Sequence, residues 1–215
     1  IAGAHAGISV GPDGATHQAV EDIAIMRTMP NMKVIVPCDA IEARKATIAA
    51  AQIWGPMYLR FAREKTPIIT TDKTPFIPGR AEVFWTPKKG KPDAVIIACG
   101  PLVYQSLCAA RELEKEGVHT VVINNHTIKP LDAETILAHA KRSGAVVTVE
   151  EHQVAGGMGS AVAELLARHA PVPMEFIGMQ DTFGESGAPD ELIEKYGMGV
   201  ESIKKAVRKA ARRKK

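Results

Sequence analysis

The sequence has few of the features that would tie it to a membrane, an oxidising compartment or a cysteine-bound metal. No apolar run reaches the roughly 18–20 residues that a helix needs to cross a bilayer, and the N-terminus lacks the basic and apolar regions of a signal peptide. The three cysteines are odd in number and match no metal-ligand spacing. We therefore expect a cytoplasmic protein that binds no membrane and holds no metal.

Aromatic residues are also scarce, at 5% of the chain, and none lies among the basic residues of the C-terminal tail. Eight of the last twelve residues are Lys or Arg and none is acidic, whereas the net charge of the whole chain is only +3. Without aromatic side chains to stack on bases, the tail does not predict nucleic-acid binding. We expect it to be a solvated, frayed terminal helix.

The composition is that of an ordinary globular protein, with 46% hydrophobic and 24% charged residues over 215 positions. Residues 93–215 predict a small α/β domain, because short apolar runs alternate with segments of helical periodicity. Strict alternation implies parallel pairing through right-handed crossovers. The expected strands are 94–98, 120–123, 146–149 and 174–177, and the expected helices are 102–116, 133–142, 159–169 and the segment after Asp190.

Residues 1–63 repeat this pattern in a unit that looks incomplete. Two strands and two helices cannot cover a sheet on both faces, and the chain lacks an initial methionine. We therefore expect that the unit packs on another chain or that its first half is missing. The expected elements are a helix from an N-cap at Thr16 to about Thr28, strands at 34–36 and 57–62, and a helix over 40–53 capped by Asp39 and Glu42.

Together these patterns predict two three-layer α/β units with mostly parallel sheets, the N-terminal one incomplete. The segment between them is rich in proline, which marks a linker with one short strand at 80–85. We place the N-terminal unit at residues 1–66, the linker at 67–92 and the C-terminal unit at 93–215.

The most distinctive segment is residues 5–18, where Gly11, Pro12 and Gly14 form a tight turn that lets the backbone approach a ligand. Asp13 lies on this turn. His17 is expected in the first turn of the following helix, where the positive end of the helix dipole disfavours an imidazolium.

Two further residues are expected at the same sheet edge, because ligands of open α/β sheets gather at the carboxyl ends of strands. Arg63 follows the strand at 57–62, and His5 lies near the end of a truncated strand. This set suits a phosphorylated polyol, with Arg63 and His5 on the phosphate and Asp13 and His17 on hydroxyls.

Each of these residues also has a structural interpretation. Asp13 would stabilise its own turn, His17 would only occupy a helix start, and Arg63 would pair with Glu64. A metal site at His5 and His17 would need a third ligand, and the spacing offers none.

The segment 11–18 reads Gly-Pro-Asp-Gly-Ala-Thr-His-Gln and is followed by Pro30-Asn31 and Pro37-Cys38-Asp39. This order resembles the central signature of transketolases. The chain as a whole resembles the second half of their pyrimidine-binding domain followed by their C-terminal domain, as in the C-terminal subunit of split transketolases. In the C-terminal unit the resemblance is carried by Val149–His152, Gly156–Ser160 and Phe183–Gly187.

The resemblance implies a homodimeric enzyme of the pentose phosphate pathway. Thiamine diphosphate lies between domains of different subunits in this family, and a two-carbon ketol unit passes between sugar phosphates. Carried over by motif, His5 and Arg63 would bind the substrate phosphate, and Asp13 would hold the C2 hydroxyl of the donor. His17 would contact the C1 side and assist proton transfers.

The resemblance also implies what this chain does not supply. The glutamate and the aromatic wall of the aminopyrimidine site would precede Ile1, and the metal and diphosphate motif belongs to another domain or subunit. We therefore expect neither thiamine diphosphate nor Mg²⁺ to bind this chain alone, and we expect no turnover without its partner. Three further groups are read as structural: the glycines of 156–160 as close packing, Glu150–His152 as a strand-end turn or subunit contact, and Cys38 and Cys99 as buried packing residues.

Three other functions are open at this point. The sequence His5-Ala6-Gly7 also resembles that of deoxyxylulose-phosphate synthases. A 2-oxoacid dehydrogenase beta-type subunit is a further relative, but it usually lacks the histidine at position 17. The chain could also be a non-catalytic dimerisation or scaffold module.

Overall fold

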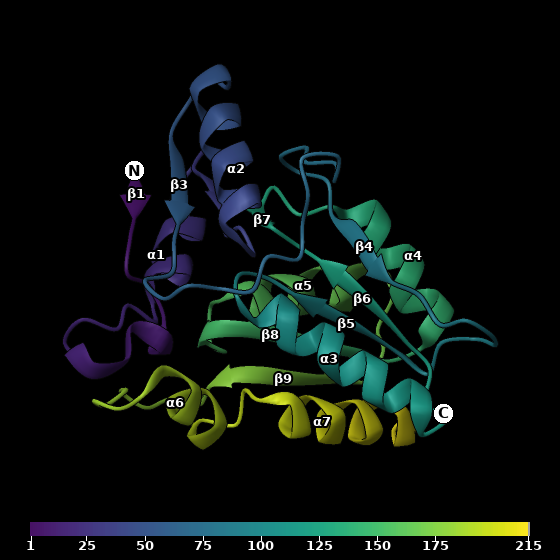
Figure 1. Cartoon of the computed structure of the whole chain (residues 1–215). Helices are drawn as coiled ribbons and strands as arrows, with labels where there is room; N and C mark the ends of the chain where they lie inside the picture. The colour runs from purple at the N-terminus through teal and green to yellow at the C-terminus, as the bar shows by residue number, and fades with distance from the viewer. Residues whose placement is uncertain (215) are drawn as a thin grey trace.

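In the computed structural model, which describes residues 1–214, two β-sheets with their helices lie side by side (Figure 1). The first sheet has four strands in the order β1-β3-β2-β7, and only β7 runs antiparallel to its neighbour. Its elements are β1 (Ala2–Gly3), the 3₁₀ segment η1 (Ile8–Asp13), α1 (Asp22–Thr28), β2 (Lys33–Ile35), α2 (Ala40–Gln52), β3 (Met57–Arg60) and β7 (Thr127–Lys129).

The second sheet has five strands in the order β4-β6-β5-β8-β9, of which β4 alone is antiparallel. Three-layer packing results, because helices cover both of its faces. Its elements are β4 (Glu82–Trp85), β5 (Ala94–Ala98), α3 (Leu102–Lys115), β6 (Thr120–Asn124), α4 (Ala133–Ser143), β8 (Val146–Gln153), α5 (Met158–His169), β9 (Met174–Met179), α6 (Pro189–Lys195) and α7 (Val200–Arg212).

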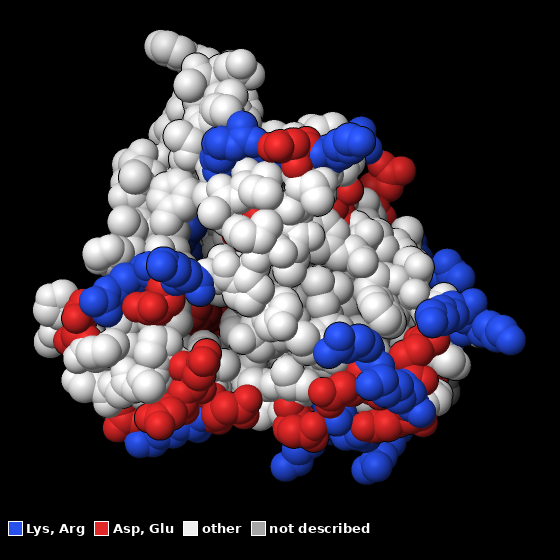
Figure 2. Space-filling model, in the orientation of Figure 1, with Lys and Arg blue, Asp and Glu red and all other residues white. Residues whose placement is uncertain are grey.

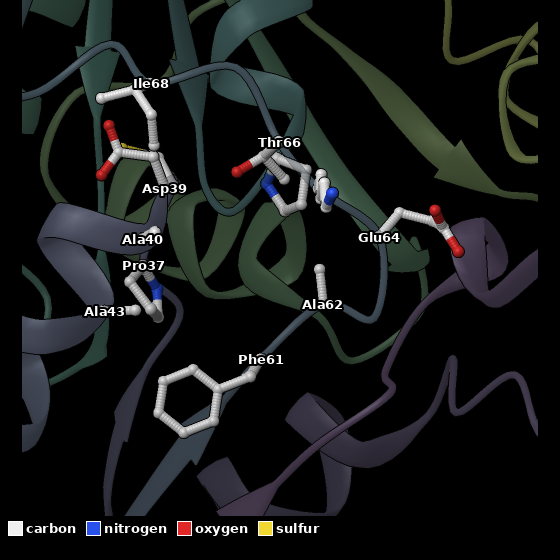
Figure 3. A pocket seen from close by; sticks show the side chains of 12 residues that line it. Pro37, Asp39, Ala40, Ala43, Phe61, Ala62, Glu64, Thr66 and Ile68 are labelled. Carbon is white, nitrogen blue, oxygen red and sulfur yellow. The ribbon is translucent and has the colours of Figure 1, made fainter.

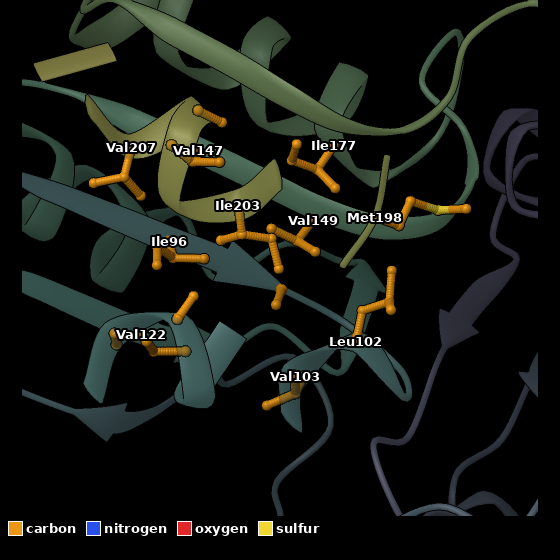
Figure 4. Packing of buried hydrophobic residues seen from close by; sticks show 14 of the residues in the cluster. Ile96, Leu102, Val103, Val122, Val147, Val149, Ile177, Met198, Ile203 and Val207 are labelled. Atoms are coloured by element: carbon orange, nitrogen blue, oxygen red, sulfur yellow. The ribbon is translucent and has the colours of Figure 1, made fainter. Parts of the chain in front are cut away.

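The apolar strands of the second sheet feed two separate cores, because successive side chains of a strand point to opposite faces. Ile96 of β5 packs in one core with α3, α6 and α7. Its neighbours Val95 and Ile97 pack in the other core with α4 and α5. Figure 4 shows the first core, where Leu102 of α3 and Ile203 of α7 surround the strand residues. Burial on both faces explains why the strand sequences are continuously apolar.

The predicted fold class is confirmed, and most elements lie within a few residues of their predicted bounds. The helix predicted from Thr16 is wrong at its start, since α1 begins only at Asp22. Residues 15–17 form a turn instead, in which His17 N donates to Gly14 O at 3.0 Å.

Strand β7 was not predicted, and it joins the two parts of the chain. It follows β6 of the second sheet but pairs with β2 of the first, with Val34 opposite Lys129. One strand of the sheet in the N-terminal unit therefore comes from the C-terminal half of the chain.

The terminal helix expected in the basic tail is present up to Arg212, but it packs against the rest of the protein and is not frayed as expected. Residues 200–212 form α7, which packs its apolar side onto the second sheet. Lys204 contacts Glu112 at 2.8 Å, and Lys209 and Arg213 both contact Glu175. Figure 2 shows the resulting mixture of acidic and basic residues along the lower edge of the molecule. Among residues 1–214, no helix is long and apolar enough to span a bilayer.

Candidate functional site

The loop that carries the predicted site begins at the end of β1 and folds back beside β3. Ala6 N donates to Phe61 O at 3.0 Å, which places His5 next to the carboxyl end of β3. Residues 8–13 then form η1, which is interrupted at Gly11, where φ is 75°. Only glycine adopts this conformation readily, so the sequence of the turn follows from its geometry.

Asp13 and Arg63 meet at this sheet edge, as predicted. Arg63 Nη1 lies 3.6 Å from Asp13 Oδ2 and donates to Val10 O at 2.7 Å. The two side chains are 32% and 37% exposed, so they remain open to a ligand. Arg63 Nη1 also lies 3.8 Å from Glu64 Oε1, so the predicted structural pairing is present too.

The two histidines lie on the same loop, but no hydrogen bond or ion pair within residues 1–214 joins them to Asp13 or Arg63. Both are exposed. His17 Nδ1 lies 3.0 Å from Thr16 Oγ1. The argument from the helix dipole fails for His17, because the residue lies in a turn five residues before α1 begins.

Residues of the C-terminal half contact this loop and support it, and these contacts are not evident from the sequence. Gln18 is buried, and its Nε2 donates to Ile8 O at 3.1 Å and to Glu185 O at 2.9 Å. A Cβ on Gly14 would come within 2.6 Å of Ser186 Oγ. Glu185 and Ser186 belong to the motif Phe183–Gly187, which was the available signal in the sequence, whereas Phe183 itself is exposed.

A buried ion pair fastens α1 to the two sheets. Arg60 Nε of β3 lies 2.8 Å from Asp22 Oδ2, and Tyr58 also donates to that oxygen. Burial opposes ionisation of Asp22, but the charge and hydrogen bond of Arg60 hold its pKa below the ordinary value. Arg60 Nη2 also donates to Ala19 O and Glu151 O, both at 2.9 Å.

Three backbone amides of the glycine-rich segment at 156–160 already have partners within the chain, beginning with Gly156 N, which donates to Ser160 Oγ at 2.9 Å. Met158 N and Gly159 N, in the first turn of α5, already donate to the carboxylate of Glu150 at 2.6 and 2.7 Å. Burial raises the pKa of Glu150 to about 7. Glu150, Glu151 and His152 lie within β8 and are buried, so they do not form the strand-end turn that was expected.

A cavity of about 480 Å³ lies beside the site, between the segments that follow β2 and β3. Figure 3 shows its wall from Pro37 and Phe61 to Thr66 and Ile68. Asp39 at its rim caps α2 by accepting from Glu42 N at 2.9 Å. Burial, reinforced by Glu42, raises the pKa of Cys38, which disfavours the thiolate form that a nucleophile requires.

No group of three or more His, Cys, Asp or Glu side chains within residues 1–214 is placed to hold a metal ion. The guanidinium of Arg63 and the carboxylate of Asp13 can bind a polar, anionic ligand.

Comparison with known proteins agrees with this geometry. The family model described as the transketolase pyrimidine binding domain matches residues 1–68, and that of the transketolase C-terminal domain matches residues 85–203. A solved structure described as a split gene transketolase, inactive beta4 tetramer, has a TM-score of 0.91 and 43% identity, covering 100% of this chain and 67% of that one.

Curated relatives point the same way. The 6-deoxy-6-sulfo-D-fructose transketolase subunit of Clostridium sp. (strain MSTE9) is 38% identical over 100% of this chain and 65% of its own length. The 1-deoxy-D-xylulose-5-phosphate synthase of Desulfitobacterium hafniense is 40% identical over 92% of this chain and 31% of its own length. This chain therefore spans less than two thirds of the length of either relative. Its two matched domains establish that the chain belongs to the transketolase family, as a C-terminal component.

Proposed function

We propose that this chain is the C-terminal component of a thiamine-diphosphate-dependent transketolase that transfers a two-carbon ketol unit between sugar phosphates. The approach of Asp13 to Arg63, at 3.6 Å on an open glycine turn, carries the proposal. This approach places a carboxylate that can accept hydrogen bonds from sugar hydroxyls beside a guanidinium that can bind phosphate. The domain division at 1–66, 67–92 and 93–215 belongs to the same proposal, as does a place in the cytoplasm and the pentose phosphate pathway.

Arg63 is the principal phosphate ligand in this proposal. Among residues 1–214, its hydrogen bond to Val10 O and the distances of 3.6 Å to Asp13 and 3.8 Å to Glu64 all involve Nη1. Nε and Nη2 therefore keep their N–H groups for two phosphate oxygens, in the fork geometry that suits this anion. His5, exposed at the neighbouring strand end, adds a second donor.

Asp13 and His17 act on the sugar itself. Asp13 accepts a hydrogen bond from the C2 hydroxyl of the donor and so fixes its orientation. His17, on the exposed turn that follows, binds the C1 side and moves protons to and from the sugar.

Thiamine diphosphate supplies the carbanion chemistry when it is bound. In this proposal a diphosphate-binding partner domain or subunit holds the cofactor and its Mg²⁺. The active assembly would be a homodimer of such pairs, with this chain binding the sugar phosphates.

The test is reconstitution. The purified chain, mixed with thiamine diphosphate, Mg²⁺ and sugar phosphates, should show no ketol transfer and no tight cofactor binding by calorimetry. Addition of the diphosphate-binding partner should produce transfer. Turnover by the chain alone would refute the division of labour, and no transfer by the assembly would favour a scaffold module.

A second candidate is a deoxyxylulose-phosphate synthase component. The sequence His5-Ala6-Gly7 and the relative from Desulfitobacterium hafniense favour this second function. Assaying the reconstituted assembly for a 1-deoxy sugar phosphate as product, instead of a ketol-transfer product, separates the two reactions.

A further inference from the structure

The carboxylate of Glu151 reaches from β8 of the second sheet into the loop that carries the candidate site. Glu151 Oε1 accepts a hydrogen bond from Ser9 N at 2.5 Å. Both residues are buried, with Glu151 only 2% exposed. A Cβ on Gly7 would come within 2.4 Å of Glu151 Oε1, and Gly7 has a φ of +94°. The loop is therefore folded around this carboxylate.

The backbone of Glu151 is itself held in place. Arg60 Nη2 donates to Glu151 O at 2.9 Å, while Arg60 Nε lies 2.8 Å from Asp22 Oδ2. Arg60 is 4% exposed, so water does not compete with these contacts. Glu151 is thus a rigid support.

A short series of contacts leads from Glu151 to the substrate-binding groups. Ser9, whose amide Glu151 holds, is followed by Val10, whose carbonyl oxygen accepts from Arg63 Nη1 at 2.7 Å. Arg63 Nη1 in turn lies 3.6 Å from Asp13 Oδ2. Displacement of the Ser9 amide would therefore move the carbonyl that orients Arg63. Figure 1 shows the η1 loop against the C-terminal half, beside α6.

We infer that Glu151 is a positioning residue of the candidate site, through which the C-terminal half sets the geometry of Arg63 and Asp13 for an anionic sugar. Glu151 does not touch the ligand. The inference rests on the proposed function for its catalytic consequence, but not for its effect on the loop.

The neighbouring Glu150 provides a matched control. It is equally buried, at 1% exposed, and is also a carboxylate that accepts from backbone amides. Its partners are Met158 N and Gly159 N at the start of α5, and not the loop. The Glu150 variant therefore shows how much amide exchange changes when any buried carboxylate is removed from β8.

The experiment compares Glu151→Met, Glu151→Gln and Glu150→Met by amide hydrogen exchange of the chain. Methionine fills the space but accepts no strong hydrogen bond, so Glu151→Met should speed exchange of residues 7–18 by about 10- to 100-fold. Glu151→Gln keeps an acceptor oxygen and should restore exchange to within about 3-fold of wild type. Glu150→Met should leave residues 7–18 unchanged while loosening residues 157–160.

In the enzyme assembled with its partner, Glu151→Met should raise KM for the phosphorylated donor by about 10-fold, with a smaller change in kcat. Unchanged exchange at 7–18, or a glutamine variant as impaired as the methionine variant, would overturn the inference. The inference would also be overturned if Glu151→Met speeds exchange of the loop but keeps a wild-type KM, provided that Arg63→Ala raises KM in the same assay.

Two measurements keep the result interpretable. Exchange of the Ser9 amide in the wild-type chain needs no variant to fold, and it should be slower than that of the exposed Thr16 amide. Equal rates would contradict the inference. If neither Arg63→Ala nor Asp13→Asn affects ketol transfer, the proposed function fails, whereas the exchange result decides the loop support separately.

Discussion

Replacement of Arg63 by alanine should separate phosphorylated from unphosphorylated donors. Arg63 Nη1 is occupied by Val10 O and Asp13, so the guanidinium retains Nε and Nη2 for phosphate. A hydrogen bond to a charged group contributes about 1.5–3 kcal/mol, and the side chain is 32% exposed, which favours the lower figure for each bond.

One such bond corresponds to about a 10-fold change in affinity and two to about a 100-fold change. We therefore expect Arg63→Ala to raise KM for a phosphorylated ketose donor by about 10- to 100-fold, with a change of less than about 3-fold for an unphosphorylated ketose. The assay is steady-state ketol transfer by the enzyme assembled with its diphosphate-binding partner.

Arg44→Ala is the matched control, since Arg44 is an exposed arginine of α2 whose ion pair among residues 1–214 is with Asp72 on the surface. It should leave both KM values unchanged. Equal losses for both donors in Arg63→Ala would refute the reasoning, because Arg63 would then act by holding Val10 and Asp13 rather than by binding phosphate.

Two further predictions concern proton transfer and pH. His17→Ala should lower kcat at least about 10-fold with a smaller effect on KM, and a variant with full kcat would remove His17 from the proton-transfer role. Glu150 has its pKa raised to about 7 from 4.5, so its contribution to stability is fully present below pH 4.5 and is lost as pH rises through about 7. Urea unfolding should therefore show that wild type loses up to about 3 kcal/mol more stability than Glu150→Gln between pH 4.5 and pH 8, and parallel pH profiles would contradict this assignment.

Local features of the fold follow from neighbouring residues and could be predicted. Asp39 and Glu42 begin a helix because the Asp39 carboxylate accepts from the Glu42 amide three residues on, as the structure shows. Gly117 ends α3 with a φ of +77°, which its lack of a side chain permits. The runs at 94–98 and 146–149 predict buried strands because they are apolar on both faces.

Part of the site was predictable for the same reason, and part was not. Gly11 and Gly14 signal the turn that carries Asp13 through their own conformations, and Arg63 and His5 are predicted at one sheet edge because the carboxyl ends of parallel strands coincide. The predicted start of α1 is wrong, because Thr16 is a good N-cap residue but its neighbours are held in a turn by contacts with distant residues.

The sequence by itself determined the alternation of strands and helices and the glycine turn, because these depend on residues a few positions apart. Only the tertiary structure decided that β7 joins the first sheet and that Glu151 supports the loop of Ser9 from 142 residues away. Such pairings depend on which distant backbone groups must be satisfied once they are buried together, and the nearby sequence does not encode that choice.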